Sequence, residues 1–201
     1  MLRLSAADKN RMLTAMPPSN FSIDSSTRAI AFDKGAVITQ TPATFWLITK
    51  GAVKTLTWDE TGKVITLGYW GAGDVIGLPF SAVDPYEVQC LSNVEARSVP
   101  DCHSSQYAKE ITFCLRQTDE LLRILRIERM YYRLYQLLLW LGNKFGDRVA
   151  EGILINIRLT HQELADLIGS TRVTVTRLLN QLETEQKILR PGRFNIILQN
   201  D

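Results

Sequence analysis

Residues 159–183 read LTHQELADLIGSTRVTVTRLLNQLE, and this stretch decides how the last part of the chain folds. Thr160, followed three residues later by a glutamate, forms the pattern of a capping box, which begins a helix. Gly169 suits a tight turn after that helix, because glycine adopts a positive backbone φ most easily. The stretch therefore predicts two short helices, at about 161–168 and 171–184.

The two predicted helices share a small apolar core. Ala165 lies where the first helix must approach the second closely, since a larger side chain would separate them. Ser170 or Thr171 can cap the second helix. The other apolar residues fall at helical spacing and complete the core; they are Leu164, Leu167, Ile168, Val175, Leu178 and Leu179.

The second helix has a polar outer face. With its apolar positions turned inward, the 3.6-residue period places Arg172, Val173, Thr176 and Arg177 outside. Arginine can bond a guanine edge through two hydrogen bonds, a valine or threonine methyl can touch the thymine methyl, and hydroxyls can reach phosphates. The alternative is a helical hairpin whose polar face is merely solvated. We favour DNA binding, because the caps, the turn glycine, the arginines and the flanking segments agree.

Both flanks of the helix pair are β-rich. ILINIRL at 153–159 precedes it, and KILRPGRFNIILQ at 187–199 follows it, with a turn at Pro191-Gly192. The order strand, helix, turn, helix, hairpin is that of a winged helix-turn-helix.

An earlier region, from Thr27 to Val99, reads as short strands separated by glycine turns. β-rich runs occupy 45–49, 52–58 and 63–70, and 88–99 adds one or two more strands. Strands at this spacing predict an antiparallel barrel or roll. Its aromatic residues are expected in the barrel core, with an apolar pocket or a protein-binding surface as the alternatives; they are Phe45, Trp46, Trp58, Tyr69 and Trp70.

The residues between these regions predict one long helix, from about Ser104 to Phe145. They contain neither proline nor glycine before Gly142, and their leucines recur at helical spacing. Such a length favours pairing with a second helix, although packing on the chain's own barrel remains the alternative. A hinge is expected at 142–152. The residues expected to pair are Leu121, Leu122 and Leu125.

The composition of the chain does not identify a function, but it excludes some classes of protein. The chain has 201 residues and a net charge of only +2, so any argument for DNA binding must come from where the charges lie. The first residues, MLRLSAADKNRMLTAMPPSN, have no apolar core long enough for a secretory signal. The run LYQLLLWLG at 134–142 is much shorter than the roughly 20 residues of a membrane span. A cytoplasmic protein without membrane association is expected.

The helix-turn-helix stretch resembles the DNA-binding region of the cyclic-AMP receptor protein / fumarate-nitrate regulator (CRP/FNR) superfamily. IGSTRVTVTRLL at 168–179 is especially similar to the nitrogen-control regulators of cyanobacteria. The resemblance extends through KGAVK at 50–54, GAGDVIG at 71–77 and YRLYQLLLWLGNKFG at 132–146. It implies an α+β fold with an N-terminal double-stranded β-helix (a β-roll like that of cyclic-nucleotide-binding domains), a long dimerisation helix and a C-terminal winged helix-turn-helix. The implied domains are 1–118, 119–146 and 147–201.

The resemblance also implies partners and DNA contacts. A homodimer would read a twofold-symmetric site in double-stranded promoter DNA and act on RNA polymerase, as activator or repressor. Arg172 and Arg177 would read base edges. Val173 stands where the cyclic-AMP branch carries a glutamate, so the half-site should change, towards the GTA…TAC type. The implied phosphate contacts are Thr160, His161, Ser170, Thr171 and Thr174.

The β-roll departs from its relatives at the cyclic-nucleotide site. Members that bind cyclic nucleotides carry a Gly-Glu pair and an arginine that grips the phosphate. Here GDVIGLPFSAVDPYEVQC at 73–90 lacks that pair, and no lysine or arginine lies between Val64 and Glu95. A buried phosphate without a cation is poorly compensated. We therefore do not expect cyclic AMP to bind.

The nitrogen-control relatives bind 2-oxoglutarate, which remains a possible effector, as does a partner protein. Their pocket resembles Val75, Ile76, Gly77 and Leu78, but Asp84 lies near the position of their carboxylate-gripping arginine. On the helix, one alignment brings in Cys114 and Asp119, and a shifted one brings in Arg123 and Glu128. An acid at the arginine position would repel a dicarboxylate.

Other sensor types and catalysis have less support. Cys90, Cys102 and Cys114 are too few and too far apart for an iron–sulfur cluster or a metal site and fit reduced thiols. A cysteine redox switch and haem at Cys102-His103 are further alternatives. The two histidines, His103 and His161, lie outside the predicted barrel, and no nucleophile–base pair or phosphate-binding glycine loop is present. We do not expect an enzyme, a metal or a fixed cofactor.

Overall fold

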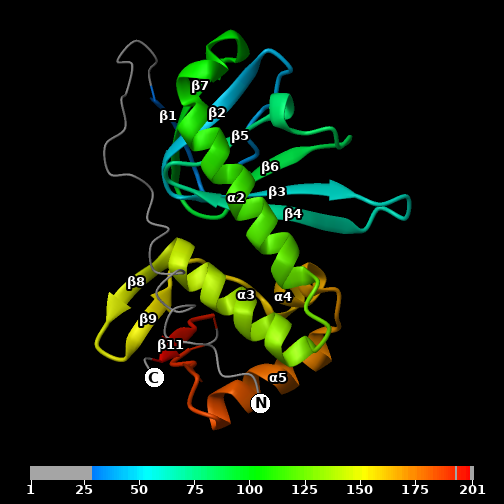
Figure 1. The fold of residues 1–201 in the computed structure, drawn as a ribbon, viewed down its shortest axis with the longest axis vertical. Helices are drawn as coiled ribbons and strands as arrows, with labels where there is room; N and C mark the ends of the chain where they lie inside the picture. Colours follow the sequence, from blue (N-terminus) through cyan, green and yellow to red (C-terminus); the bar gives the residue numbers. More distant parts are fainter. Residues whose placement is uncertain (1–28, 193, 200–201) are drawn as a thin grey trace. The chain divides into compact units, whose positions relative to one another are not determined.

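The computed structural model describes residues 29–192 and 194–199. They form two compact units, one ending at Glu120 and the other beginning at Leu121 (Figure 1). Among the described residues, no helix is long and apolar enough to cross a membrane.

The first unit is a roll of two antiparallel sheets, with strand orders β1-β7-β2-β5 and β4-β3-β6. Side chains from both sheets meet in one apolar cluster, which includes Trp46, Ile48, Val53 and Val88. A helical segment, η2 and α2, follows the last strand. The elements are β1 (Ala29–Phe32), β2 (Thr44–Lys50), β3 (Ala52–Trp58), β4 (Val64–Gly71), β5 (Val75–Ile76), η1 (Leu78–Phe80), β6 (Glu87–Cys90), β7 (Val94–Pro100), η2 (Asp101–Tyr107) and α2 (Ala108–Leu125).

The β-roll predicted from the sequence is confirmed. The runs predicted at 45–49, 52–58 and 63–70 are β2, β3 and β4, and the run at 88–99 forms both β6 and β7. Of the aromatic residues expected in the core, Phe45, Trp46 and Tyr69 are buried, whereas Trp58 and Trp70 are half-buried. Trp70 Nε1 donates a hydrogen bond to Thr55 Oγ1 at 2.9 Å.

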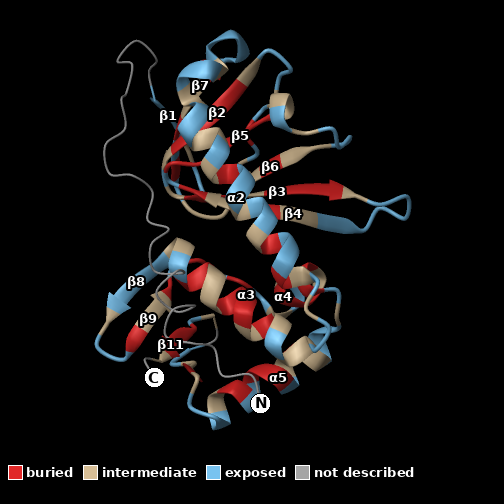
Figure 2. Cartoon of the chain, in the orientation of Figure 1, coloured by how far each residue is buried: buried red, intermediate tan, exposed pale blue. Residues whose placement is uncertain are grey.

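The second unit contains the predicted winged helix-turn-helix. Its helix α3 packs on α4, α5 and the small sheet, whose strand order is β10-β11-β9-β8. Buried and exposed residues alternate along its helices (Figure 2). The elements are α3 (Met130–Phe145), β8 (Gly146–Val149), β9 (Gly152–Ile155), α4 (His161–Ile168), α5 (Arg172–Thr184), β10 (Ile188–Leu189) and β11 (Ile197–Gln199).

The prediction of one continuous helix from about 104 to 145 is wrong, because the helix breaks at 126–129. Arg133 gives a physical reason. Its Nε donates to the Ile127 carbonyl and its Nη1 to the Ile168 carbonyl, both at 2.8 Å. A carbonyl released from a helix needs another donor, and Arg133, six residues further along the chain, supplies it. No proline or glycine marks the break in the sequence.

The break separates two kinds of leucine. The α3 residues Leu134, Leu137, Leu138 and Leu141 are buried, but against the winged elements of the second unit and not against the barrel that the alternative named. The three leucines expected to pair differ from one another: Leu121 is buried, Leu125 half-buried and Leu122 is 54% exposed.

The glycines at 142–152, where a hinge was expected, are positions of close packing. A Cβ on Gly142 would lie 2.2 Å from Leu198 Cδ1, and one on Gly152 would lie 2.0 Å from the Leu198 carbonyl oxygen. The segment after α3 is the β8–β9 hairpin, paired in register. Residues 119–146 were expected to stand apart from 147–201, but α3 packs into one unit with the winged elements.

We expect Gly152→Ala to lower the free energy of unfolding of the second unit by about 3 kcal/mol or more, because it combines backbone strain with overpacking. The backbone φ of Gly152 is +145°, and the added Cβ would meet main-chain atoms. Urea unfolding followed by circular dichroism measures the effect.

Gly169→Ala is the matched control, because the φ of Gly169 is +68° and its Cβ would meet nothing within 4 Å. It should cost only about 1–2 kcal/mol. Equal losses in the two variants would contradict the packing role of Gly152.

Candidate nucleic-acid interface

Helix α4 begins and ends as the sequence predicts. Thr160 Oγ1 accepts from the Glu163 backbone N–H at 3.1 Å, and the Glu163 carboxylate accepts from the Thr160 backbone N–H at 2.9 Å, which completes the capping box. Gly169 closes the helix with φ 68° and ψ 47°. The Thr160 hydroxyl also donates to Glu163. Its hydrogen is thus already committed within the protein, so Thr160 acts first as a helix cap.

Helix α5 is capped by Thr171, the second of the two residues considered. Thr171 Oγ1 accepts from the Thr174 backbone N–H at 3.2 Å, and the two hydroxyls are 3.0 Å apart. Ser170 is half-buried in the turn and donates its backbone N–H to Ala165. The buried face of α5 consists of Val175, Leu178, Leu179 and Leu182.

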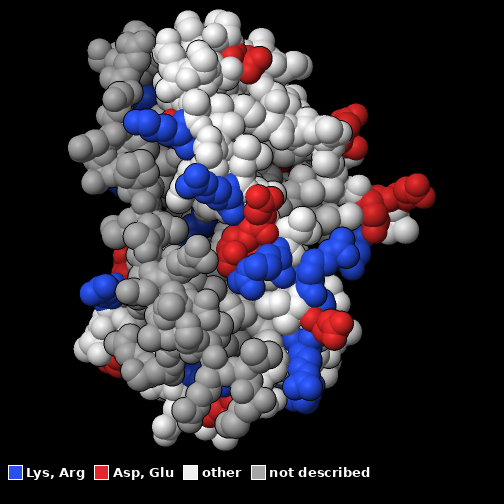
Figure 3. All heavy atoms as spheres, in the orientation of Figure 1, with Lys and Arg blue, Asp and Glu red and all other residues white. Residues whose placement is uncertain are grey.

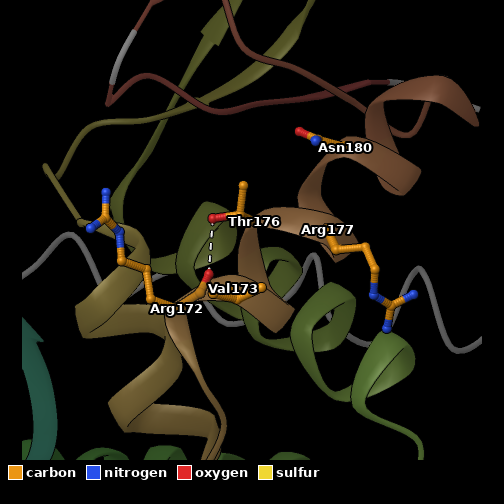
Figure 4. Close-up of a pocket in the computed structure, with 5 residues that line it drawn as sticks. All are labelled: Arg172, Val173, Thr176, Arg177 and Asn180. Atoms are coloured by element: carbon orange, nitrogen blue, oxygen red, sulfur yellow. Dashed lines mark hydrogen bonds between the residues drawn. The ribbon is translucent and has the colours of Figure 1, made fainter.

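The opposite face of α5 lines an open hollow on the surface. We call this set of five residues the recognition face: Arg172, Val173, Thr176, Arg177 and Asn180. Val173 is 79% exposed, which is high for an aliphatic side chain. Figure 4 shows Arg172 and Arg177 pointing away from each other along the helix.

Four of these five residues were predicted, and Asn180 was missed. Its position, four residues after Thr176 and eight after Arg172, places it on the same helical stripe, so the periodicity could have identified it. Basic and acidic side chains are both present on the face drawn in Figure 3. The net charge of the whole chain is only +2, so bulk charge does not single out a DNA-binding surface.

Hydrogen bonds join α4 to the recognition face. Thr176 Oγ1 donates to the Arg172 carbonyl at 2.9 Å. A hydroxyl has one hydrogen, so the 2.8 Å contact with His161 Nδ1 must have the histidine as donor. His161 therefore carries its proton on Nδ1 when neutral, and Nε2 becomes a donor only after protonation. Burial, and then the positive charges of Arg190 and Arg172, lower the pKa of His161.

The residues proposed for an effector pocket differ in burial and belong to both units. Val75 and Ile76 are buried in the apolar clusters of the roll, and Gly77 backs onto Phe45. Leu78 is half-buried, whereas Asp84 and Asp119 are exposed. Arg123 and Glu128 are exposed residues of the other unit.

A polar cluster that was not predicted from the sequence lies next to Val75. Asp74 is buried, and its carboxylate accepts from the Gly71 backbone N–H and from Gln117 Nε2, both at 2.7 Å. Cys114 Sγ lies 3.4 Å from the Val75 backbone N–H and 3.7 Å from Asp74 Oδ1. The cluster ties the β4–β5 turn to α2. Asp74, the aspartate of GAGDVIG, is the residue from which the sequence could have indicated this cluster.

Similarity to known proteins agrees with this geometry. The Crp-like helix-turn-helix domain matches residues 132–200. The chain is 40% identical over 187 residues to the regulatory protein CysR of Synechococcus elongatus, covering 92% of this chain and 90% of that one. It is 34% identical over 159 residues to the global nitrogen regulator of a Nostoc species, covering 71% of each. A CRP/FNR-family transcriptional regulator from Thermus thermophilus has the same fold, with a TM-score of 0.70 at 24% identity over 86% of this chain and 94% of that one.

We expect the second unit to lose stability as the pH falls below 6.5, the ordinary histidine pKa. Because the folded-state pKa of His161 is lowered, the unfolded chain takes up the proton at a higher pH than the folded chain does, and acid therefore favours unfolding. Urea unfolding at about pH 7.5 and about pH 5.5 measures this, and His161→Gln should reduce the difference.

His103→Gln is the control, since His103 is the other histidine of the chain and lies in the first unit. An unchanged pH dependence in His161→Gln would show that another group is responsible.

Proposed function

The chain belongs to the CRP/FNR family of transcription regulators, and we propose that two copies of it bind a palindromic promoter site through their α5 helices. Its relatives are regulators, and the chain is not an enzyme. The recognition face carries the proposal, because it presents arginine, aliphatic and hydroxyl groups outward from a helix that is capped and buried on its other side.

Each group on this face has a counterpart in the major groove. Arg172 and Arg177 suit guanine edges, and the exposed methyl groups of Val173 suit the methyl group of thymine. Val173 offers no carboxylate to accept from cytosine, which favours a half-site of the GTA…TAC type over that of regulators with glutamate there. We assign Ser170, Thr171 and Thr174 to phosphates, and Thr160 to their support through the α4 cap. His161 can donate to a phosphate from Nε2 only when its ring is protonated, because Nδ1 is already bonded to Thr176.

Helix α2 provides the proposed dimer contact. Leu115 and Leu122 are seven residues apart and 62% and 54% exposed, on a different side of α2 from the buried Leu121 and Ile124. A seven-residue repeat of exposed leucines fits a paired helix. We therefore assign Leu115, Leu122 and the half-buried Leu125 to the dimer interface, and Leu121 to the interior of the protomer. Pairing would set two recognition helices about 34 Å apart, one DNA turn.

The β-roll is the proposed sensor. Because Asp74 bonds both the β4–β5 turn and Gln117 of α2, a change at that turn would reach the dimer helix through two hydrogen bonds. No lysine or arginine lies between Val64 and Glu95, so cyclic AMP is not proposed as the effector. Calorimetric titration with 2-oxoglutarate, cyclic nucleotides and candidate partner proteins separates a small-molecule sensor from a protein-docking platform. RNA polymerase is the proposed downstream partner.

We expect Arg177→Ala to weaken binding to a selected palindromic duplex by about 1–3 kcal/mol and to relax the preference at one base pair per half-site. Fluorescence anisotropy with single-base variants of the duplex measures both effects. Arg148→Ala, which removes an exposed arginine from β8, is the control and should keep the base preference. An equal loss on every sequence would show that Arg177 contacts only phosphate.

Replacing Leu115 and Leu122 together by glutamate should convert the dimer to a monomer, because four carboxylates would then face each other across the interface. Sedimentation velocity gives the mass, and circular dichroism checks that the protomer remains folded. Val37→Glu, at a valine that is 50% exposed in the first unit, is the matched control and should stay dimeric. A dimer that survives the double replacement would place the interface elsewhere.

A further inference from the structure

Asn180 is the member of the recognition face nearest the end of α5, and its side chain is held by the wing, which is the hairpin of β10 and β11. Arg190, which follows β10, donates from Nη2 to Asn180 Oδ1 at 2.6 Å. Asn180 is exposed and lines the same open hollow as Arg177, although the two side chains point in different directions (Figure 4). The hydrogen bond therefore prevents the amide group from rotating by 180° and exchanging the positions of its oxygen and nitrogen.

Arg190 is itself fixed by Glu183 on α5. Its Nε donates to Glu183 Oε2 at 3.0 Å, its Nη2 donates to the same oxygen, and its backbone N–H donates to Glu183 Oε1 at 3.2 Å. The Arg190 side chain is only 20% exposed. The hydrogen bond from Arg190 lowers the pKa of Glu183, so the carboxylate stays ionised and the link persists at neutral pH.

From this arrangement we propose that Asn180 is a DNA phosphate contact, with Arg190 and Glu183 as its positioning residues. The inference rests on the proposed function of α5. With Oδ1 bound to Arg190, the amide turns its two Nδ2 hydrogens outward as donors. A phosphate oxygen is a pure acceptor and suits them, whereas asparagine reads adenine through its oxygen and its nitrogen together.

The place of Asn180 on the helix agrees with a phosphate contact. It lies eight residues beyond Arg172, about 12 Å along the helix axis. Base edges are read by the first residues of a recognition helix, so a residue this far along reaches the rim of the groove, where the phosphates lie.

Substitution of single phosphates in the DNA tests the contact directly. A series of duplexes, each with one neutral methylphosphonate per half-site, is titrated with full-length protein. We expect one position at which wild-type binding weakens about tenfold. Asn180→Ala should weaken binding to the unmodified duplex by a similar factor and lose no further affinity at that position.

Three further variants test the orientation of the amide. Asn180→Asp keeps an acceptor for Arg190 but has no donor and repels phosphate, so it should bind more weakly than Asn180→Ala. Arg190→Met should reduce affinity in the wild-type background and much less in the Asn180→Ala background. Glu183→Gln keeps the shape of the side chain and weakens the link to Arg190. Its affinity for the duplex should lie between those of the wild-type protein and Arg190→Met. All should keep the ratio of affinities for single-base variants, and thermal unfolding checks that each is folded.

The outcomes separate this inference from the proposed function. A lower preference at one base pair in Asn180→Ala would make Asn180 a base-reading residue. Wild-type affinity in Asn180→Ala would remove Asn180 from the interface. Either result overturns the inference but leaves the proposed function intact, provided that Arg177→Ala still relaxes the base preference. If wild-type protein binds no palindromic duplex, the proposed function itself fails.

Discussion

The close packing of α4 against α5 is the constraint on which the DNA-binding unit depends. Ala165 is fully buried between the helices, and the left-handed Gly169 lets the chain reverse direction within a single turn. The buried face of α5 then fixes the rotation of the helix about its axis. Its outward residues follow from that rotation alone, so the recognition face results from packing inside the protein.

Hydrogen bonds further fix the positions of the side chains on the recognition face. The His161–Thr176 hydrogen bond ties the start of α4 to the middle of α5, and the Glu183–Arg190–Asn180 set ties the wing to its end. Long side chains at a protein surface lose conformational entropy when they bind a partner, and groups already held in place lose less. A recognition face held by hydrogen bonds from α4 and from the wing is therefore suited to a rigid partner such as duplex DNA.

The sequence predicted what local patterns control. The capping box at Thr160, the turn at Gly169 and the outward position of Arg172 all depend on spacing within a few residues, and the strands of the roll follow from glycine turns. What it did not predict depends on side-chain hydrogen bonds that follow no helical or strand periodicity. Arg133 bonds the Ile127 carbonyl six residues before it and the Ile168 carbonyl 35 residues after it, Asp74 is bonded by Gln117 of α2, and Asn180 is held by Arg190. The apolar pattern of the sequence does not identify these partners.

Methylation interference on a palindromic duplex tests the central claim most directly, which is that paired α5 helices read guanine edges in the major groove. Methyl groups on guanine N7 in the two half-sites, about 34 Å apart on one side of the duplex, should abolish binding because they block the acceptors that arginine uses. Full binding to DNA methylated at every guanine, or interference confined to a single half-site, would contradict the account.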